Sequence, residues 1–337
     1  MLIFLLFQNI NILLTIYLMY VKIICKYSFG WENMKTLKQN LSAILAAFIW
    51  GSAFIAQEMC SDYLGAFSIT ALRSMVAVIV LAVMVTILNK TGKSTVKAKN
   101  KSYNKRLIKG GVFCGIALTA ATILQQSGIA QSGAGKSAFI TAMYVVIVPI
   151  LGLFIKKRAA ANVWVSVFIC IIGFYFLCLY GQGSLGISGG DFLVFLCAVI
   201  FAVHILIIEN FSDVDSIELS CVQFFVVAVV STIFMFLFEN INISSIISCI
   251  LPILYLGIFS SGIAYTLRMV ALKDSNPTVI TLLLSLESVF AILCERFIFR
   301  TNVNPMYWWE IFGCILIFSA VIFSQISFES KKMHLKS

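Results

Sequence analysis

Apolar runs of membrane-spanning length dominate the chain, and short polar connections separate them. About 20 consecutive apolar residues are needed to cross a bilayer as a helix. Ten such runs are predicted after residue 35, at residues 41–58, 66–88, 108–128, 138–155, 161–179, 190–208, 217–238, 250–271, 278–299 and 308–326. The expected fold class is therefore an all-α polytopic membrane protein.

A further apolar run covers residues 3–25. No positive charge precedes it and no small-residue cleavage site follows it, so it does not have the pattern of a signal peptide. It is either an extra N-terminal helix or an extension upstream of a start at Met34.

The pattern repeats itself in the second half of the chain. Residues 67–77 align with residues 217–227, which places Arg73 opposite Gln223. Because each half holds five spans, an odd number, the second half must be inverted relative to the first. Inverted repeats are typical of secondary transporters, with the binding site at the repeat interface. The expected organisation is an N-terminal extension (1–34), a first repeat (35–180), a second repeat (188–326) and a tail (327–337).

Composition agrees with a membrane protein and excludes a soluble globular one. Hydrophobic residues make up 61% of the 337 residues and charged residues 11%, against about half and about a quarter in soluble domains. The chain has ten cysteines but no CxxC motif. Buried membrane cysteines are therefore expected rather than a redox or metal site. Seven lie inside apolar runs: Cys114, Cys170, Cys178, Cys197, Cys221, Cys294 and Cys314.

The net charge of +10 reflects the topology rather than nucleic-acid binding. Lys and Arg collect on one side of the predicted membrane, 17 against 3, and eight of the 17 lie in the connection at residues 89–109. Because positive charge marks cytoplasmic loops, the N-terminus of the ten-helix core and the C-terminus are expected in the cytoplasm. The connection at residues 209–218 disagrees, with four acids and no base, but acids weigh little in this rule.

Two glycine-rich segments imitate nucleotide-binding motifs. Residues 130–137 nearly fit a P-loop, and residues 181–186 fit GxGxxG. Both follow predicted membrane helices, whereas these motifs require a preceding strand. No HExxH, GxSxG or metal-spaced His/Cys cluster occurs. No enzyme activity, cofactor, metal or nucleic-acid partner is therefore expected.

Short motifs along the chain point to a family. They lie at residues 50–54, 71–73, 124–128, 134–141, 144–149, 201–205, 264–265, 271–272 and 284–290. In order and spacing they resemble the drug/metabolite transporter (DMT) superfamily, EamA type, over residues 35–326. The resemblance implies ten helices in two inverted five-helix EamA-like repeats and alternating access. It also favours a start at Met34, since family members begin shortly before the first span.

The ninth predicted span departs from the family pattern at two places. Ser288 stands where the family usually has proline, which puts the expected kink in question. Arg300 and Thr301 stand where the family usually has Gly-Glu, so any role of that glutamate is lost or has moved to Glu295.

Ionisable residues inside the spans are costly in a membrane, which makes them candidates for the site. Glu287 could bind a cationic group or couple to protons, or it could be a neutral acid between helices. His204 could titrate near neutral pH or bond to a neighbouring carbonyl. Arg73 could bind a substrate carboxylate, but pairing with Asp62 or Glu58 is favoured.

Polar amides and aromatic residues complete the set of candidates. Gln125 and Gln126 could contact a polar solute or hold helices together, and Gln223 aligns with Arg73. The aromatic candidates Trp50, Tyr144 and Tyr265 could line a pocket or pack against neighbours. In an inverted arrangement Glu287 and the two glutamines should approach one cavity.

The predicted function is secondary transport, with the solute and the bilayer as partners. We expect a plasma-membrane exporter of a small polar or amino-acid-like metabolite. The alternative is a flippase-like protein of the same superfamily that handles lipids. The oligomeric state stays open between a monomer and a homodimer.

The charge distribution gives a testable topology. Single cysteines at positions 93 and 331 should be cytoplasmic, and those at positions 184 and 242 external, in a cysteine-depleted background. An impermeant thiol reagent applied to intact cells should label only the second pair. Labelling at Lys93 from outside would contradict the inverted-repeat arrangement.

Overall fold

The structure is a computed structural model that describes residues 33–91, 100–155, 160–180, 188–273, 275–299 and 307–325. All regular structure within these ranges is helical. Eight helices are long and apolar enough to cross a membrane, and two shorter apolar helices complete the expected ten. The predicted all-α polytopic fold is thus confirmed. The apolar run 3–25, positions 93, 184 and 331 and the pair Arg300–Thr301 lie outside the described residues.

The first half contains five spans. They are α2 (Asn33–Ser61), α3 (Ala66–Lys90), α4 (Lys101–Ser132), α5 with α6 (Ala134–Ala142 and Tyr144–Phe154), and α7 with the π-helical η1 (Ala161–Phe174 and Tyr175–Leu179). Asn100 caps α4, because its side chain accepts a hydrogen bond from the Tyr103 backbone N–H, as an N-cap residue does.

The second half repeats this order. Its first two spans are α8 (Gly189–Asn210) and α9 (Ser216–Phe238), and the short α10 (Ile243–Ser248) follows them. The third span consists of α11, η2 and α12 (Ile250–Tyr255, Leu256–Ala264 and Tyr265–Leu272). The fourth consists of α13, α14 and η3 (Pro277–Leu284, Leu286–Leu293 and Cys294–Phe299), and the fifth is α15 (Trp308–Gln325). Ser188 and Asp191 form a capping box at the start of α8, which satisfies two exposed backbone donors.

Both fourth spans are interrupted in their middle. The first breaks at Met143 and the second at Ser285, where the backbone ψ angles are −13° and −14°. The second of these spans is therefore interrupted although Ser288 replaces the family proline. At the interruption the Ser285 hydroxyl donates to the Leu282 carbonyl at 2.7 Å, a type of side-chain bond that often accompanies a bend in a helix.

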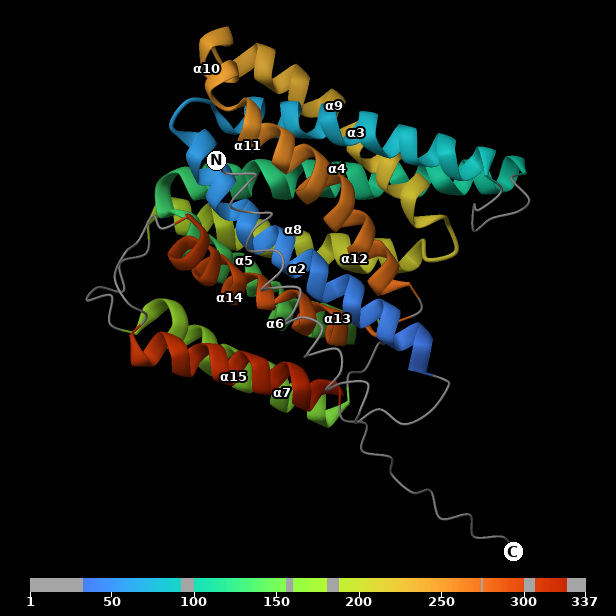
Figure 1. Ribbon diagram of the computed structural model, residues 1–337. Helices are drawn as coiled ribbons and strands as arrows, with labels where there is room; N and C mark the ends of the chain where they lie inside the picture. Colours follow the sequence, from blue (N-terminus) through green and yellow to red (C-terminus); the bar gives the residue numbers. More distant parts are fainter. Residues whose placement is uncertain are drawn as a thin grey trace, which may run out of the picture.

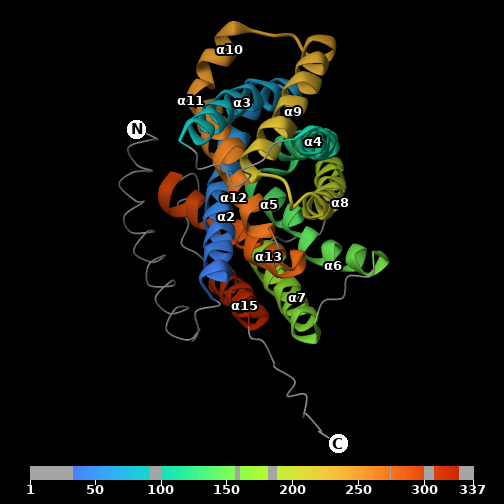
Figure 2. The same cartoon turned by 90° about the vertical axis from the view of Figure 1, so that its right-hand side faces the viewer.

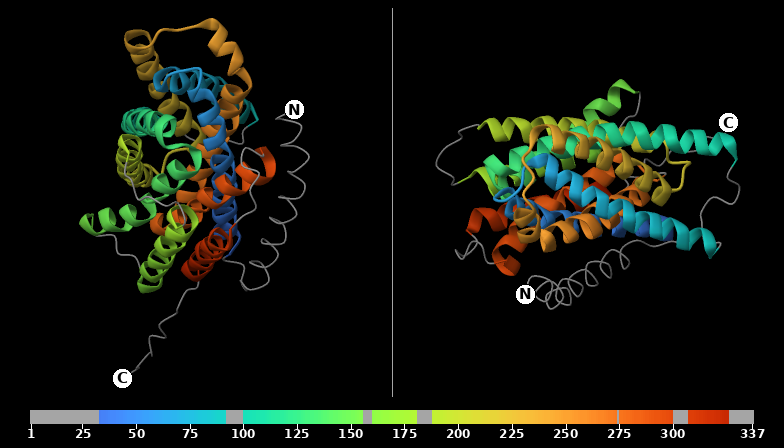
Figure 3. Two further views of the ribbon diagram at one scale, coloured as in Figure 1. Left: turned by 90° about the vertical axis from the view of Figure 1, so that its left-hand side faces the viewer. Right: turned by 90° about the horizontal axis from the view of Figure 1, so that it is seen from above.

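The two halves pack on each other reciprocally. The third span of each half contacts the first and second spans of the other, so α4 lies on α8 and α9 while η2 lies on α2 and α3. The second spans α3 and α9 pair at one edge, and the fifth spans α7 and α15 pair at the opposite edge (Figures 1 and 2). The left-hand view of Figure 3 shows the same two pairs from a further side. This arrangement is consistent with inverted repeats.

Glycine allows the third span of each half to approach the second span of the other closely. A Cβ at Gly115 on α4 would lie 2.9 Å from the carbonyl oxygen of Gln223 on α9, and one at Gly257 on η2 would lie 2.9 Å from that of Arg73 on α3. Gln223 and Arg73 are the positions that align between the halves. The same backbone contact therefore occurs twice, once in each direction.

These two glycines provide a test of the reciprocal packing. Gly115→Ala and Gly257→Ala should each lower the melting temperature of the purified protein, because overpacking costs about 1–3 kcal/mol. Gly135→Ala is the matched control, since its added Cβ would meet only Glu295 Oε2 at 3.5 Å, an ordinary contact. Melting temperatures equal to the control would contradict the close approach.

Candidate functional site

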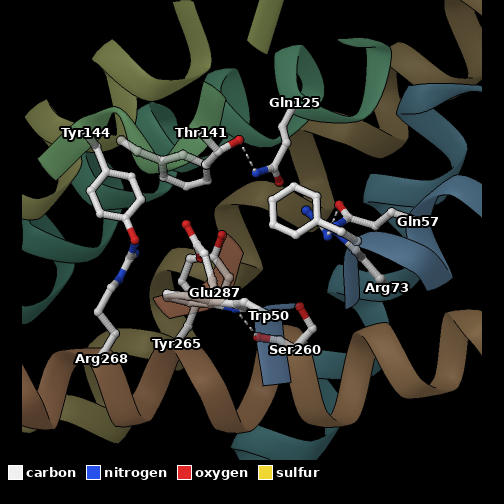
Figure 4. A pocket seen from close by; sticks show the side chains of 12 residues that line it. Trp50, Gln57, Arg73, Gln125, Thr141, Tyr144, Ser260, Tyr265, Arg268 and Glu287 are labelled. Atoms are coloured by element: carbon white, nitrogen blue, oxygen red, sulfur yellow. Dashed lines mark hydrogen bonds between the residues drawn. The ribbon is translucent and has the colours of Figure 1, made fainter. Parts of the chain in front are cut away.

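A cavity lies in the interior and is lined by both halves (Figure 4). It contains about 380 Å³ of space between atoms, part of it open to solvent. Its lining is mixed, with two arginines, one carboxylate, amides, hydroxyls and aromatic rings. The lining residues are Trp50, Phe54, Gln57, Arg73, Gln125, Thr141, Tyr144, Phe201, Ser260, Tyr265, Arg268 and Glu287.

The two helix breaks bring polar side chains into the cavity. Tyr144 is the first residue of α6, after the break at Met143, and Glu287 is in the first turn of α14, after the break at Ser285. Glu287 is 3% exposed. Its carboxylate and the Tyr144 hydroxyl lie close enough to interact with each other, but Glu287 Oε1 and the hydroxyl make no hydrogen bond of regular geometry to any described residue. A buried oxygen without a partner is costly, so this part of the cavity has unused capacity to bind a donor.

Arg268 is the cationic group that the sequence analysis missed. Its guanidinium lies over the rings of Tyr265 and Trp50, 4.5 and 5.1 Å from their centroids. It is 2% exposed, and its Nε has no hydrogen-bond partner among the described residues. The sequence did indicate this residue, since Arg268 lies inside the predicted span 250–271, three residues before its end. An ionisable residue inside a membrane span is by default a functional candidate.

His204 lies behind Arg268, outside the cavity lining. Arg268 Nη2 donates to His204 Nδ1 at 2.8 Å, and His204 Nε2 is 3.1 Å from Gln223 Oε1. Because a guanidinium can only donate, Nδ1 must accept, and the ring proton is therefore on Nε2 and points to Gln223. His204, which is fully buried, thus holds Arg268 in place as a neutral ring.

Arg73 does not pair with an acid in the part of the chain that the structure describes. Its Nη1 donates to Gln57 Oε1 at 3.0 Å, whereas Glu58 and Asp62 are exposed. The expected pairing with these acids is wrong because successive helical residues point about 100° apart. Gln57 faces the interior from α2 while Glu58 faces outward.

The neighbouring glutamines on α4 separate for the same reason. Gln125 lines the cavity and donates to the Thr141 hydroxyl at 3.3 Å. Gln126 lies behind it and donates to the Gln57 carbonyl at 3.1 Å and to the Ser61 hydroxyl at 2.9 Å. Gln126 therefore joins α4 to α2, as polar side chains between membrane helices do.

In each half, hydrogen bonds that involve one arginine connect the first three spans. The partners are the side chains of Gln57 and Gln126 in the first half and those of His204 and Gln223 in the second. In the first half Arg73 is on the second span and Gln126 on the third. In the second half the types are exchanged, with Gln223 on the second span and Arg268 on the third. The cavity consequently receives one arginine from each half, from different spans.

Six of the nine residues proposed from the sequence line the cavity: Trp50, Arg73, Gln125, Tyr144, Tyr265 and Glu287. The other three, Gln126, His204 and Gln223, lie behind the lining. Six further lining residues were not proposed: Phe54, Gln57, Thr141, Phe201, Ser260 and Arg268. Apart from Arg268 they are types that occur throughout the spans, so only their position identifies them.

The described residues contain no group of three His, Cys, Asp or Glu that could hold a metal.

Known proteins resemble this chain in sequence and in structure. The sequence model of the EamA-like transporter family matches residues 37–179 and 188–325. An uncharacterized transporter of Archaeoglobus fulgidus is 28% identical over 297 residues, which is 87% of each chain. A crystal structure of a protein with 16% sequence identity superposes with a TM-score of 0.67, covering 85% of this chain and 96% of that one. This last match shows a shared fold.

The contact chain through His204 predicts a stability defect. His204→Ala should destabilise the folded protein by about 1–3 kcal/mol, because it leaves the Arg268 and Gln223 groups buried without a partner. Cys197→Ala is the control, since Cys197 is on the same helix and equally buried. Thermal melting in detergent measures both variants, and a His204→Ala protein no less stable than the control would contradict the assigned contacts.

Proposed function

Because the chain belongs to the EamA-like transporter family, we propose that it moves a small polar, amino-acid-like solute across the plasma membrane by alternating access. The observation that carries the proposal is the central cavity, in which groups of opposite charge keep unused hydrogen-bonding capacity. Buried polar groups normally find partners in the protein, so unpaired ones in a cavity point to a partner that comes and goes.

The charges of the lining favour a zwitterion. Within the described parts of the chain, the Nε atoms of Arg73 and Arg268 have no hydrogen-bond partner, and Glu287 Oε1 makes no hydrogen bond of regular geometry. A guanidinium suits a carboxylate, and a carboxylate suits an ammonium group. A solute that carries both charges would be held at two places, and its orientation would be fixed.

Aromatic walls restrict the size of the solute. Trp50 and Tyr265 meet edge to face with centroids 4.9 Å apart, and Trp50 Nε1 donates to the Ser260 carbonyl at 3.2 Å. A compact metabolite fits this space better than a lipid with long acyl chains.

Alternating access is supported by the reciprocal packing. Two halves in equivalent environments can rock around a fixed central site and open it to either side. The broken fourth spans place Tyr144 and Glu287 beside that site, at points where the helices can bend. We propose export as the direction, with both ends of the ten-helix core in the cytoplasm.

Reconstitution tests this proposal. Purified protein in liposomes should exchange labelled zwitterionic solutes faster than cationic, anionic or neutral ones of similar size. Cells that make the protein should release more of the transported solute than cells that lack it. Movement of a fluorescent lipid between leaflets without any solute flux would instead favour the lipid-handling alternative.

Glu287→Gln is the decisive variant within this assay. Glutamine keeps the volume of the side chain but removes its charge, so flux should fall tenfold or more, equivalent to about 1.4 kcal/mol. Folded yield should stay near that of the unmodified protein. A well-folded Glu287→Gln protein that transports at the unmodified rate would contradict the role of the carboxylate.

A further inference from the structure

The two interrupted fourth spans pack against each other reciprocally. The part of each span before its break contacts the part of the other span after its break, so α5 lies on α14 and α6 lies on α13. Figure 1 shows these two pairs in the interior of the molecule. The breaks at Met143 and Ser285 therefore lie where the two fourth spans cross.

A hydrogen bond joins α14 to α5 at this crossing. The Ser288 hydroxyl donates to the Ala138 carbonyl at 3.1 Å, and the two residues are 1% and 0% exposed. Ser288 is the third residue after the break at Ser285. The third residue after the break at Met143 is Val146, whose side chain has no polar atom. The bond from Ser288 therefore has no equivalent from the same position of the other fourth span.

The bonded serine is next to the carboxylate that lines the cavity. Glu287 precedes it in the first turn of α14. Figure 4 shows Glu287 and Thr141 of α5 around the same cavity. Ala138 and Thr141 are three residues apart and thus on the same side of α5. The hydrogen bond consequently fixes the turn that carries Glu287 relative to the helix that carries Thr141.

The same turn also rests on α2. A Cβ at Gly51 would lie 2.7 Å from the Glu287 carbonyl oxygen and 2.6 Å from Phe290 Cβ, so glycine lets α14 approach α2 closely. This contact limits the distance between the helices but has little directional preference. A hydrogen bond weakens steeply when its angle departs from linear. The bond from Ser288 therefore adds the constraint on how α14 is rotated about its own axis.

We propose that Ser288 is a positioning residue, which aims the Glu287 carboxylate at the ammonium group of the solute. This role rests on the proposed function, in which Glu287 receives the cationic group. Charge-assisted hydrogen bonds depend on the geometry of both partners, so a rotated carboxylate would hold the ammonium group less well. Ser288 stands where the family usually has proline, whose ring has no hydroxyl to donate. The direction of the carboxylate is thus held in this chain by a bond that proline cannot make.

The test measures how well the full-length protein in liposomes recognises an ammonium group. The probe is the labelled protein amino acid that exchanges fastest, and the competitor is its 2-hydroxy acid, which has a hydroxyl in place of the ammonium group. Discrimination is the half-inhibiting concentration of the hydroxy acid divided by that of the unlabelled amino acid.

Ser288→Ala should lower this discrimination about fivefold, the effect of one ordinary hydrogen bond. Glu287→Gln should lower it about tenfold or more, because a charge-assisted bond is lost. Ser166→Ala is the matched control and should leave it unchanged. Ser166 is fully buried, but its hydroxyl donates to the Asn162 carbonyl of its own helix at 2.9 Å.

The double variant Ser288→Ala with Glu287→Gln separates positioning from a general structural role. If Ser288 acts through the carboxylate, its loss has no further effect once the carboxylate is gone, and the double variant should match Glu287→Gln alone. A further loss of discrimination in the double variant would overturn the positioning role, as would unchanged discrimination in Ser288→Ala.

Other outcomes would overturn the proposed function itself. These are discrimination that Glu287→Gln leaves unchanged, and failure of the unmodified protein to exchange any protein amino acid. Either result would remove the positioning role with it, whereas a failure confined to Ser288→Ala or to the double variant would leave the proposed function intact.

Discussion

The absence of water from the bilayer interior is the constraint on which the structure depends. A backbone or side-chain polar group in hydrocarbon must find its partner within the protein. The backbone satisfies this need by forming helices throughout the described residues, and the buried polar side chains satisfy it by bonding across helices. Arg268 with His204 and Arg73 with Gln57 are the clearest cases, since each arginine is fully enclosed. These bonds fix which faces of the spans meet.

Close packing supplies the second part of the arrangement. Membrane helices associate through close contact, because lipid tails give little hydrophobic driving force between them. Gly115 and Gly257 allow the third span of each half to approach the second span of the other at equivalent points. The cavity is therefore enclosed by elements whose mutual positions are set twice, by glycine contacts and by arginine-centred hydrogen bonds. This double specification keeps a polar cavity open inside an otherwise dense bundle.

The irregular places in the helices carry the chemistry. The fourth spans break next to Tyr144 and Glu287, and the π-helical η2 contributes the Ser260 carbonyl that accepts from Trp50. π-Helical turns are rare and frequent at functional sites. A regular helix would have directed these groups to fixed faces with all carbonyls paired. The interruptions free a small number of polar groups for the interior of the cavity.

The sequence alone determined the ten spans, because apolar length is a local property that needs no knowledge of neighbours. It also determined that the halves correspond, since Arg73 and Gln223 align. It did not determine which polar groups meet. The separation of Gln125 from Gln126, the pairing of Arg73 with Gln57 rather than Glu58, and the place of Arg268 in the lining depend on helix rotation. The rotation of a helix is set by packing against helices distant in the chain, so only the tertiary structure decided the composition of the site.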